Sequence, residues 1–132
     1  MSRRTTGSME LTTWEEQPYH EIDGGPKLTR ASVTRSFHGD IEGEGTLEYL
    51  MIYHDAASAS FVGLERVVGR VGDRAGSFVL QHSGTFAGST VQATVTVVPG
   101  SGTGELHGLR GEGDFVWPHG QSGSLTLDYD IE

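Results

Sequence analysis

Apolar and polar side chains that alternate with a period of two residues constrain this chain most. The clearest case is residues 90–98, where Val91, Ala93, Val95 and Val97 alternate with Thr and Gln. A period of two places successive side chains on opposite faces of a strand, whereas the 3.6-residue period of an amphipathic helix is nearly absent here. The sequence therefore predicts an all-β protein.

Similar runs recur along the chain, separated by short turns rich in Gly, Asp and Pro. They predict about eight strands, several longer than the average of ~5–6 residues. The runs are 10–22, 28–38, 41–54, 61–71, 77–86, 90–98, 105–117 and 123–131. No helix is available to cover a parallel sheet, so the strands should pair antiparallel. Glycine supplies 20 of 132 residues, which suits bent strands that close into a barrel. We expect a closed antiparallel barrel, with a two-sheet sandwich as the alternative.

Length and charge narrow the function classes. We expect residues 1–8 to form a disordered leader and residues 9–132 to form a single β-barrel domain. The formal net charge is −9 with no basic stripe, which argues against nucleic acid and anionic membrane surfaces as partners. No apolar stretch approaches the ~20 residues of a membrane helix. The lack of cysteine and of a signal peptide predicts a cytoplasmic protein.

Several ionisable side chains share a strand face with large apolar residues, which singles them out as candidates for an interior site. They are Glu65, in phase with Phe61; His82, in phase with Phe78, Leu80 and Phe86; Glu112, in phase with Arg110 and Val116; Glu44, in phase with Leu50; and Tyr129 on an otherwise aliphatic face. Burying a charge is costly unless the charge is paired. Such groups are therefore either held in a hydrogen-bonded network or poised for function.

These faces, if they point inward, define a candidate site. The predicted catalytic residues, which would supply acid, base or electrostatic help, are Glu65, His82, Glu112 and Tyr129. The predicted substrate-binding residues are Trp14, Glu44, Phe61, Phe78, Leu80, Phe86 and Arg110. The alternative is that the carboxylates lie outside, neutralised by arginines such as Arg66 and Arg70. The six histidines lack the spacing of metal ligands, so we predict no metal site and no cofactor.

The chain also resembles the DUF3224 group of small bacterial proteins, which are related in fold to the allene oxide cyclase barrel. The resemblance rests on segments spread over nearly the whole chain: 36–45 (SFHGDIEGEG), 61–69 (FVGLERVVG), 76–84 (GSFVLQHSG), 99–106 (PGSGTGEL), 109–113 (LRGEG) and 127–130 (LDYD). It implies an eight-stranded antiparallel barrel that assembles into a homo-oligomer. It implies little about chemistry, because the group has no assigned function and fold analogy alone is a weak warrant.

Three functions stay open at this point. The first is a cofactor-free cyclase or isomerase that acts on a hydrophobic small molecule in the barrel cavity. The second is a non-catalytic ligand-binding or carrier barrel whose carboxylates are locked by arginines. The third is a filled barrel with a structural role, whose surface, such as residues 90–98, packs between subunits.

Overall fold

The fold consists of strands. The computed structural model describes residues 3–21, 26–55, 57–118 and 123–131. Within these residues it has nine strands and no helix: β1 (Arg3–Glu21), β2 (Lys27–Gly39), β3 (Ile41–Asp55), β4 (Ser58–Val71), β5 (Arg74–Ala87), β6 (Thr90–Val97), β7 (Thr103–Gly104), β8 (Leu109–Pro118) and β9 (Gly123–Ile131). All their pairings are antiparallel. The all-β, antiparallel prediction is confirmed, and the strand beyond the expected eight is the two-residue β7.

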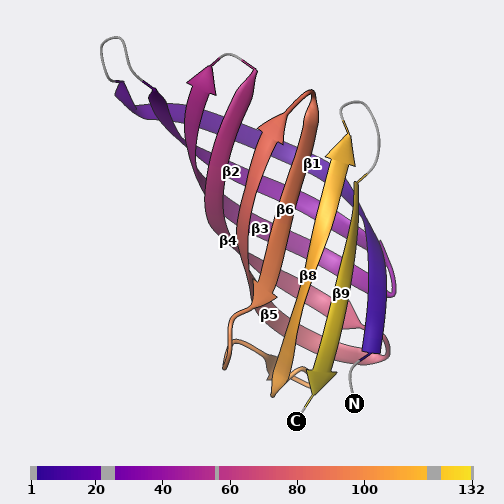
Figure 1. Ribbon diagram of the computed structural model, residues 1–132. Coiled ribbons are helices and arrows are strands. Elements are labelled where there is room, and N and C mark those ends of the chain that lie inside the picture. The colour runs from indigo at the N-terminus through magenta and orange to yellow at the C-terminus, as the bar shows by residue number, and fades with distance from the viewer. Residues whose placement is uncertain (1–2, 22–25, 56, 119–122, 132) are drawn as a thin grey trace.

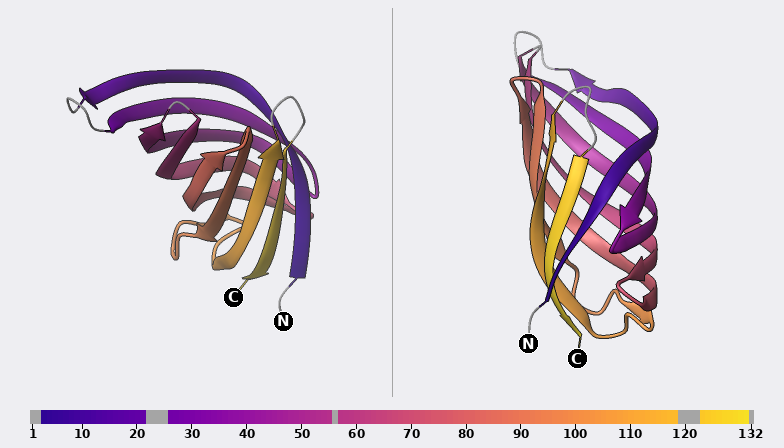
Figure 2. Two further views of the ribbon diagram at one scale, coloured as in Figure 1. Left: turned by 45° about the horizontal axis from the view of Figure 1, so that its top comes forward. Right: turned by 90° about the vertical axis from the view of Figure 1, so that its right-hand side faces the viewer.

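The described strands form one sheet whose hydrogen bonds return to their starting point. The order is β4-β3-β2-β1-β9-β8-β6-β5, with β7 beside β5, and β5 pairs again with β4. In Figure 1, β6, β8 and β9 lie in front while β2 and β3 cross behind them, and Figure 2 shows the long strands curving around the interior. The arrangement is a barrel-like ring rather than two separate sheets.

The first strand begins earlier than the sequence suggested. Residues 3–9 pair with residues 129–123 of β9, and Thr5 and Met9 are buried. The expectation of a disordered leader over residues 1–8 therefore does not hold for residues 3–8, while residues 1–2 lie outside the described part of the chain. The inward positions before Met9 are Thr5 and Gly7, so this stretch shows no apolar face in the sequence.

A bulge in β1 decides which of its side chains face the interior. The register with β2 shifts between Leu11 and Thr13, and such an extra residue moves the following side chains to the opposite face. Met9 points inward before the shift, and Trp14 and Glu16 line the interior after it. The bulge thus places an indole and a carboxylate inside.

The interior has a filled half and a hollow half. The filled half lies toward the β2–β3 and β4–β5 turns, and its side chains are almost completely buried: Phe37, Ile41, Val71, Phe78, Leu106, Leu109 and Leu127. Each such side chain contributes about 1.5–3 kcal/mol by leaving water. The hollow half lies toward the β5–β6 hairpin, which is at the top of Figure 1.

Candidate functional site

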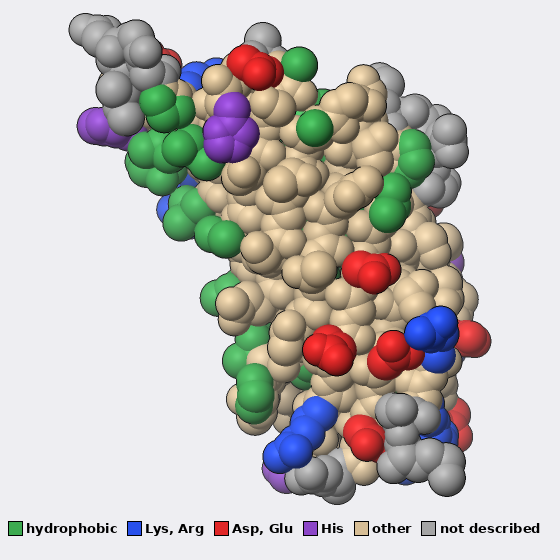
Figure 3. All heavy atoms as spheres, in the orientation of Figure 1, with side chains coloured by type: hydrophobic (Ala, Val, Ile, Leu, Met, Phe, Trp, Pro, Cys, Tyr) green, Lys and Arg blue, Asp and Glu red, His purple; other side chains and the backbone are tan. Residues whose placement is uncertain are grey.

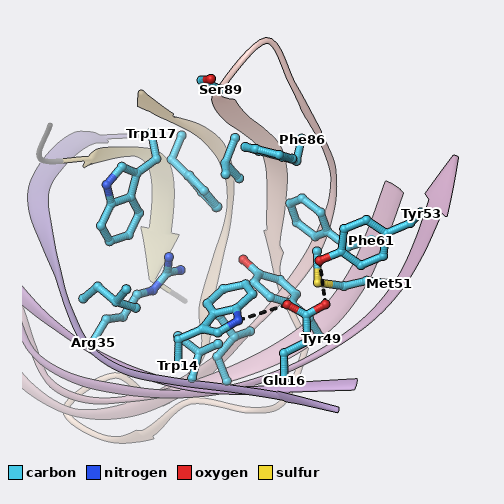
Figure 4. A pocket seen from close by; sticks show the side chains of 15 residues that line it. Trp14, Glu16, Arg35, Tyr49, Met51, Tyr53, Phe61, Phe86, Ser89 and Trp117 are labelled. Atoms are coloured by element: carbon cyan, nitrogen blue, oxygen red, sulfur yellow. Dashed lines mark hydrogen bonds between the residues drawn. The ribbon is translucent and has the colours of Figure 1, made fainter. Parts of the chain in front are cut away.

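A cavity of about 340 Å³ occupies the hollow half of the interior. Its wall is largely aromatic and aliphatic: Leu11, Trp14, Glu16, Val33, Arg35, Leu47, Tyr49, Met51, Tyr53, Phe61, Phe86, Ser89, Val91, Phe115 and Trp117. Figure 4 shows these side chains converging from opposite sides of the ring of strands. An apolar cavity of this size with a few polar groups is the usual form of a small-molecule site.

The strand period explains why the wall is aromatic. On β3, Leu47, Tyr49 and Met51 are alternate residues and all point inward. The Tyr49 ring lies 4.5 Å from that of Phe61 on the neighbouring β4 and 6.3 Å from that of Trp14 on β1, measured between centroids. Ring pairs at these separations stabilise each other, so the wall is held in place without a ligand.

A buried ion pair lies at the floor of the cavity. Arg35 on β2 donates two hydrogen bonds to Glu65 on β4, Nε to Oε2 and Nη2 to Oε1, each at 2.6 Å. The exposed fraction is 2% for the Arg35 side chain and 0% for that of Glu65. The bidentate geometry is the strongest form of such a pair. Gly45 on the intervening β3 makes it possible, because a Cβ atom there would collide with the Glu65 carboxylate and the Phe37 ring.

His82 and Tyr49 extend this pair into a chain of four residues. His82 Nε2 lies 3.0 Å from Glu65 Oε1, and the Tyr49 hydroxyl lies 3.2 Å from His82 Nδ1. An ionised carboxylate only accepts hydrogen bonds, so His82 Nε2 carries the proton and donates it to Glu65. A neutral His82 then accepts from the Tyr49 hydroxyl at Nδ1. The polar side-chain atoms of Glu65, His82 and Tyr49 thus all have partners, and Arg35 contributes Nε and Nη2.

The surroundings fix the protonation states of the chain. Burial alone would raise the pKa of the Glu65 carboxyl, but Arg35 and His82 outweigh burial and lower that pKa to about 2. Burial lowers the pKa of His82 below its ordinary 6.5, against the opposing pull of Glu65. Burial raises the pKa of Tyr49 well above its ordinary value. At neutral pH the carboxylate is therefore ionised, whereas the imidazole and the phenol are neutral.

Aromatic rings surround the Arg35 guanidinium. Its Cζ lies 5.3 Å from the ring centroid of Phe37, 5.1 Å from that of Phe115 and 6.0 Å from that of Trp117. Such contacts favour a cation. Glu65 uses two of the five N–H donors that a guanidinium carries, and the guanidinium points into the cavity between Trp117 and Tyr49 (Figure 4). Arg35 can thus offer a donor to a ligand while it stays paired.

A second carboxylate lies at the opposite side of the cavity. Glu16 Oε1 accepts a hydrogen bond from Trp14 Nε1 at 3.1 Å, and Oε2 accepts from Thr29 Oγ1 at 2.7 Å and the Tyr53 hydroxyl at 2.6 Å. Partial burial alone would raise the pKa of Glu16, but these hydrogen bonds lower it. Glu16 is therefore ionised and fixed in position.

Some predicted site residues meet as expected. Glu65 and His82 face the interior and contact each other. Phe61, Phe86 and Trp14 line the cavity. The predicted substrate-binding residues Phe78 and Leu80 are also buried, but they pack in the core below the cavity and are not among the residues that line it.

The remaining predicted residues lie elsewhere. Tyr129 points inward, but it lies near the filled end, in a small polar pocket with Arg3 and Arg74. Glu44, Glu112 and Arg110 are exposed, so their assignment to an inward face is wrong. Figure 3 shows acidic side chains gathered on the outer surface over the lower part of β8 and β9.

Glycines explain the error in facing. The inward positions of β8 include Gly111 and Gly113, and those of β3 include Gly43 and Gly45. A glycine at an inward position adds no apolar side chain, so the inward face of these strands has no apolar pattern in the sequence. The outward face, with residues such as Val116 at 48% exposure, then has the stronger apolar pattern.

Four large polar side chains of the cavity, those of Glu16, Arg35, Tyr49 and Tyr53, are not among the predicted site residues. Arg35 is in phase with Val33 and Phe37, and Tyr49 is in phase with Leu47 and Met51, so the same phase test that singled out Glu65 also points to both. Tyr53 continues the phase of Tyr49. Glu16 could not be found this way, because the bulge in β1 breaks the phase before it.

Two kinds of feature are absent from the described residues. They contain no group of three or more His, Asp or Glu side chains arranged to hold a metal ion. They also contain no helix of the length and hydropathy needed to cross a membrane.

Comparison with known proteins adds a family but no activity. A family model described as "Protein of unknown function (DUF3224)" matches residues 5–129. Among solved structures, a crystal structure of a protein with unknown function from the DUF3224 family of Shewanella oneidensis MR-1 is similar. It has 30% sequence identity and a TM-score of 0.82, and the match covers 100% of this chain and 99% of that chain. No curated protein gives a significant match.

Proposed function

The chain belongs to the DUF3224 family, and we propose that it binds a hydrophobic small molecule in its cavity without transforming it. One observation carries the proposal: an aromatic cavity of about 340 Å³ is open to a ligand while the charges at its floor are already paired. Apolar walls favour apolar ligands by roughly 25 cal/mol for each Å² removed from water. The paired floor leaves no strong net charge to attract or repel the buried end of the ligand.

Arg35 gives the site its polar specificity in this proposal. The guanidinium lines the cavity and keeps N–H groups beyond the two that bind Glu65. A ligand oxygen, such as a carbonyl, would accept a hydrogen bond there. Because the Arg35 charge is neutralised by Glu65, a neutral oxygen suffices and a carboxylate is not required.

The protonation states of the buried, hydrogen-bonded residues argue for binding over catalysis. A general base works best with a pKa near the operating pH, whereas that of Glu65 is about 2. Its two oxygens are also held by Arg35 and His82. The raised pKa of Tyr49 makes its phenol a reluctant acid. These features match a carrier whose carboxylate is locked by an arginine.

A cofactor-free cyclase or isomerase is the second candidate. The observation that favours it is the continuous hydrogen-bonded chain from Tyr49 through His82 to Glu65. Such a chain can relay a proton, because the Tyr49 hydroxyl can pass its proton to His82 Nδ1 while its oxygen takes one from the ligand. The two candidates differ in what becomes of the ligand. A ligand recovered unchanged after prolonged incubation supports the carrier, and conversion that is lost in Tyr49→Phe supports the enzyme.

Titration with the neutral apolar dye N-phenyl-1-naphthylamine tests binding. The chain contains two Trp residues, Trp14 and Trp117, and both line the cavity, so energy transfer from tryptophan to bound dye reports its occupation. We expect saturable binding. Val91→Phe, which fills part of the cavity, should weaken it at least about tenfold, or about 1.4 kcal/mol. Val62→Phe is the matched control, because Val62 is 52% exposed on the outer face. Equal binding by both variants would reject the cavity as the site.

We also propose that the sheet closes into a barrel of the allene oxide cyclase type and that the protein forms a homo-oligomer. The ring of hydrogen bonds supports closure of the sheet, and superposition on a solved allene oxide cyclase would test the relation to that barrel. The homo-oligomer is tested by light scattering of the purified protein, where a monomer mass at all concentrations would reject it.

A further inference from the structure

The charges on the cavity wall do not cancel. Two charged side chains line the cavity, Glu16 and Arg35. Arg35 is neutralised by Glu65 behind it, but the hydrogen-bond partners of Glu16 are all neutral: an indole, a threonine hydroxyl and a phenol. Within the described residues, no lysine or arginine lies within ion-pair distance of Glu16. Lys27, on the outer side, lowers the pKa of Glu16 through its charge without forming an ion pair. Glu16 is therefore the charged side chain of this wall that has no salt-bridge partner among the described residues.

The Glu16 carboxylate has room for one more donor. Oε2 accepts two hydrogen bonds and Oε1 accepts one, whereas the two oxygens of a carboxylate together accept about four. The open position is on Oε1. The three neutral partners hold the carboxylate rigid without cancelling its charge, so it is already oriented for an additional N–H group.

Aromatic rings lie around this carboxylate. Trp14 and Tyr53 point to Glu16 from two sides, and the Phe61 and Tyr49 rings lie nearby on the same wall (Figure 4). The faces of aromatic rings attract cations. Tyr53 already makes such a contact, because Lys27 Nζ lies 5.4 Å from its ring centroid. Lys27 is exposed, so this contact is reached from outside the cavity.

From these contacts we infer that the ligand carries a protonated amine on an apolar body, with the ammonium group at Glu16 and the apolar part against the aromatic wall. The inference rests on the proposed function, because it names the class of ligand for the same cavity. A carboxylate beside aromatic rings suits an alkylammonium group in both charge and shape. An anionic ligand is disfavoured at the same place.

Three naphthalenes of nearly equal size test the inference by isothermal titration calorimetry at pH 7. They are 2-naphthylmethylamine, which is a cation, 2-naphthylmethanol, which is neutral, and 2-naphthoate, which is an anion. We expect the amine to bind at least about tenfold more tightly than the alcohol, a difference of about 1.4 kcal/mol, and the anion to bind most weakly.

The variants Glu16→Gln and Glu15→Gln locate the effect. Glu16→Gln removes the charge and should reduce the preference for the amine over the alcohol to less than about twofold. Glu15 is exposed on the opposite face of β1, so Glu15→Gln should keep the full preference. A preference that survives in Glu16→Gln would overturn the assignment of Glu16.

The result also separates this inference from the proposed function. Alcohol binding that equals or exceeds amine binding would overturn the cationic ligand while it supports a binding cavity. If none of the three compounds binds, although circular dichroism shows folded protein, both the inference and the binding function are rejected.

Discussion

The filled and hollow halves of the interior are built from the same strands but differ in what their inward residues do. In the filled half, side chains such as Phe78 and Leu127 are at most 1% exposed and contribute stability. In the hollow half, Trp14, Tyr53 and Phe86 leave a cavity between them. Arg35, Glu65 and His82 lie between the halves, so a buried polar layer forms the boundary. The comparison indicates that stability resides below this layer and ligand recognition above it.

Breaking the boundary layer should have the largest effect on stability. Glu65→Gln leaves the Arg35 guanidinium buried without its counter-charge, and removal of one partner of a buried pair typically costs about 3–5 kcal/mol. The free energy of unfolding from urea titration measures this. Glu48→Gln is the control, because Glu48 pairs with Arg30 on the outer surface and should cost within about 1 kcal/mol. Equal losses in both variants would show that the layer is not the structural boundary.

Truncating a side chain should cost more stability on the filled side of the layer than on the hollow side. Leu127→Ala removes a fully buried side chain from the filled half and should cost about 2–5 kcal/mol. Phe86 is only partly buried beside an existing cavity, so Phe86→Ala should cost about 1 kcal/mol. Phe86→Ala should nevertheless weaken binding of N-phenyl-1-naphthylamine, whereas Leu127→Ala should not in the folded protein. The reverse pattern would contradict the division into two halves.

Acid should destabilise the protein through the boundary layer. The pKa of His82 is lower in the folded than in the unfolded state, so unfolded His82 takes up a proton first as pH falls below 6.5. Its contribution to stability is complete above that pH and is lost as the pH falls toward the folded pKa. The slope is at most about 1.4 kcal/mol per pH unit. The pKa of Glu65 is also lower in the folded state than in the unfolded state. Its contribution to stability is therefore lost as the pH falls from about 4.5 toward about 2.

Urea titrations at several pH values between 7 and 5 measure how much His82 contributes to the pH dependence of the free energy of unfolding. In His82→Asn the slope over this range should be smaller than in the unmodified protein. His107→Asn serves as the control, because His107 is exposed and its substitution should leave the slope unchanged. A slope lost in His107→Asn and kept in His82→Asn would contradict the assignment to the boundary layer.

The sequence was sufficient to predict the class of fold because the signal is local. On β4 and β5 large apolar side chains stand in phase with Glu65 and His82, so Phe61, Phe78 and both polar residues could be assigned to the correct face although Gly63 and Gly84 also face inward. The assignment failed where glycines occupy inward positions, as at Gly111 on β8. A glycine has no side chain, so it gives no sign of whether its position on the strand faces inward or outward.

The site was harder to predict than the fold because its contacts join distant strands. Nothing in the sequence around Gly45 indicates that it leaves room for Glu65, or that Arg35 is the partner of that carboxylate. These contacts depend on the register of β2, β3 and β4. The inward position of Glu16 depends on the bulge in β1, and the alternation pattern does not reveal that bulge.

The central claim is that the hollow half is a ligand site, and the two indole N–H signals in a ¹H–¹⁵N correlation spectrum test it most directly. Both tryptophans line the cavity, and the chain has no others. Addition of N-phenyl-1-naphthylamine should shift both indole signals, while backbone amides in the filled half, such as those of Phe78 and Leu127, stay unchanged. Unchanged indole signals together with shifts on the outer face of β3 and β4 would contradict the account.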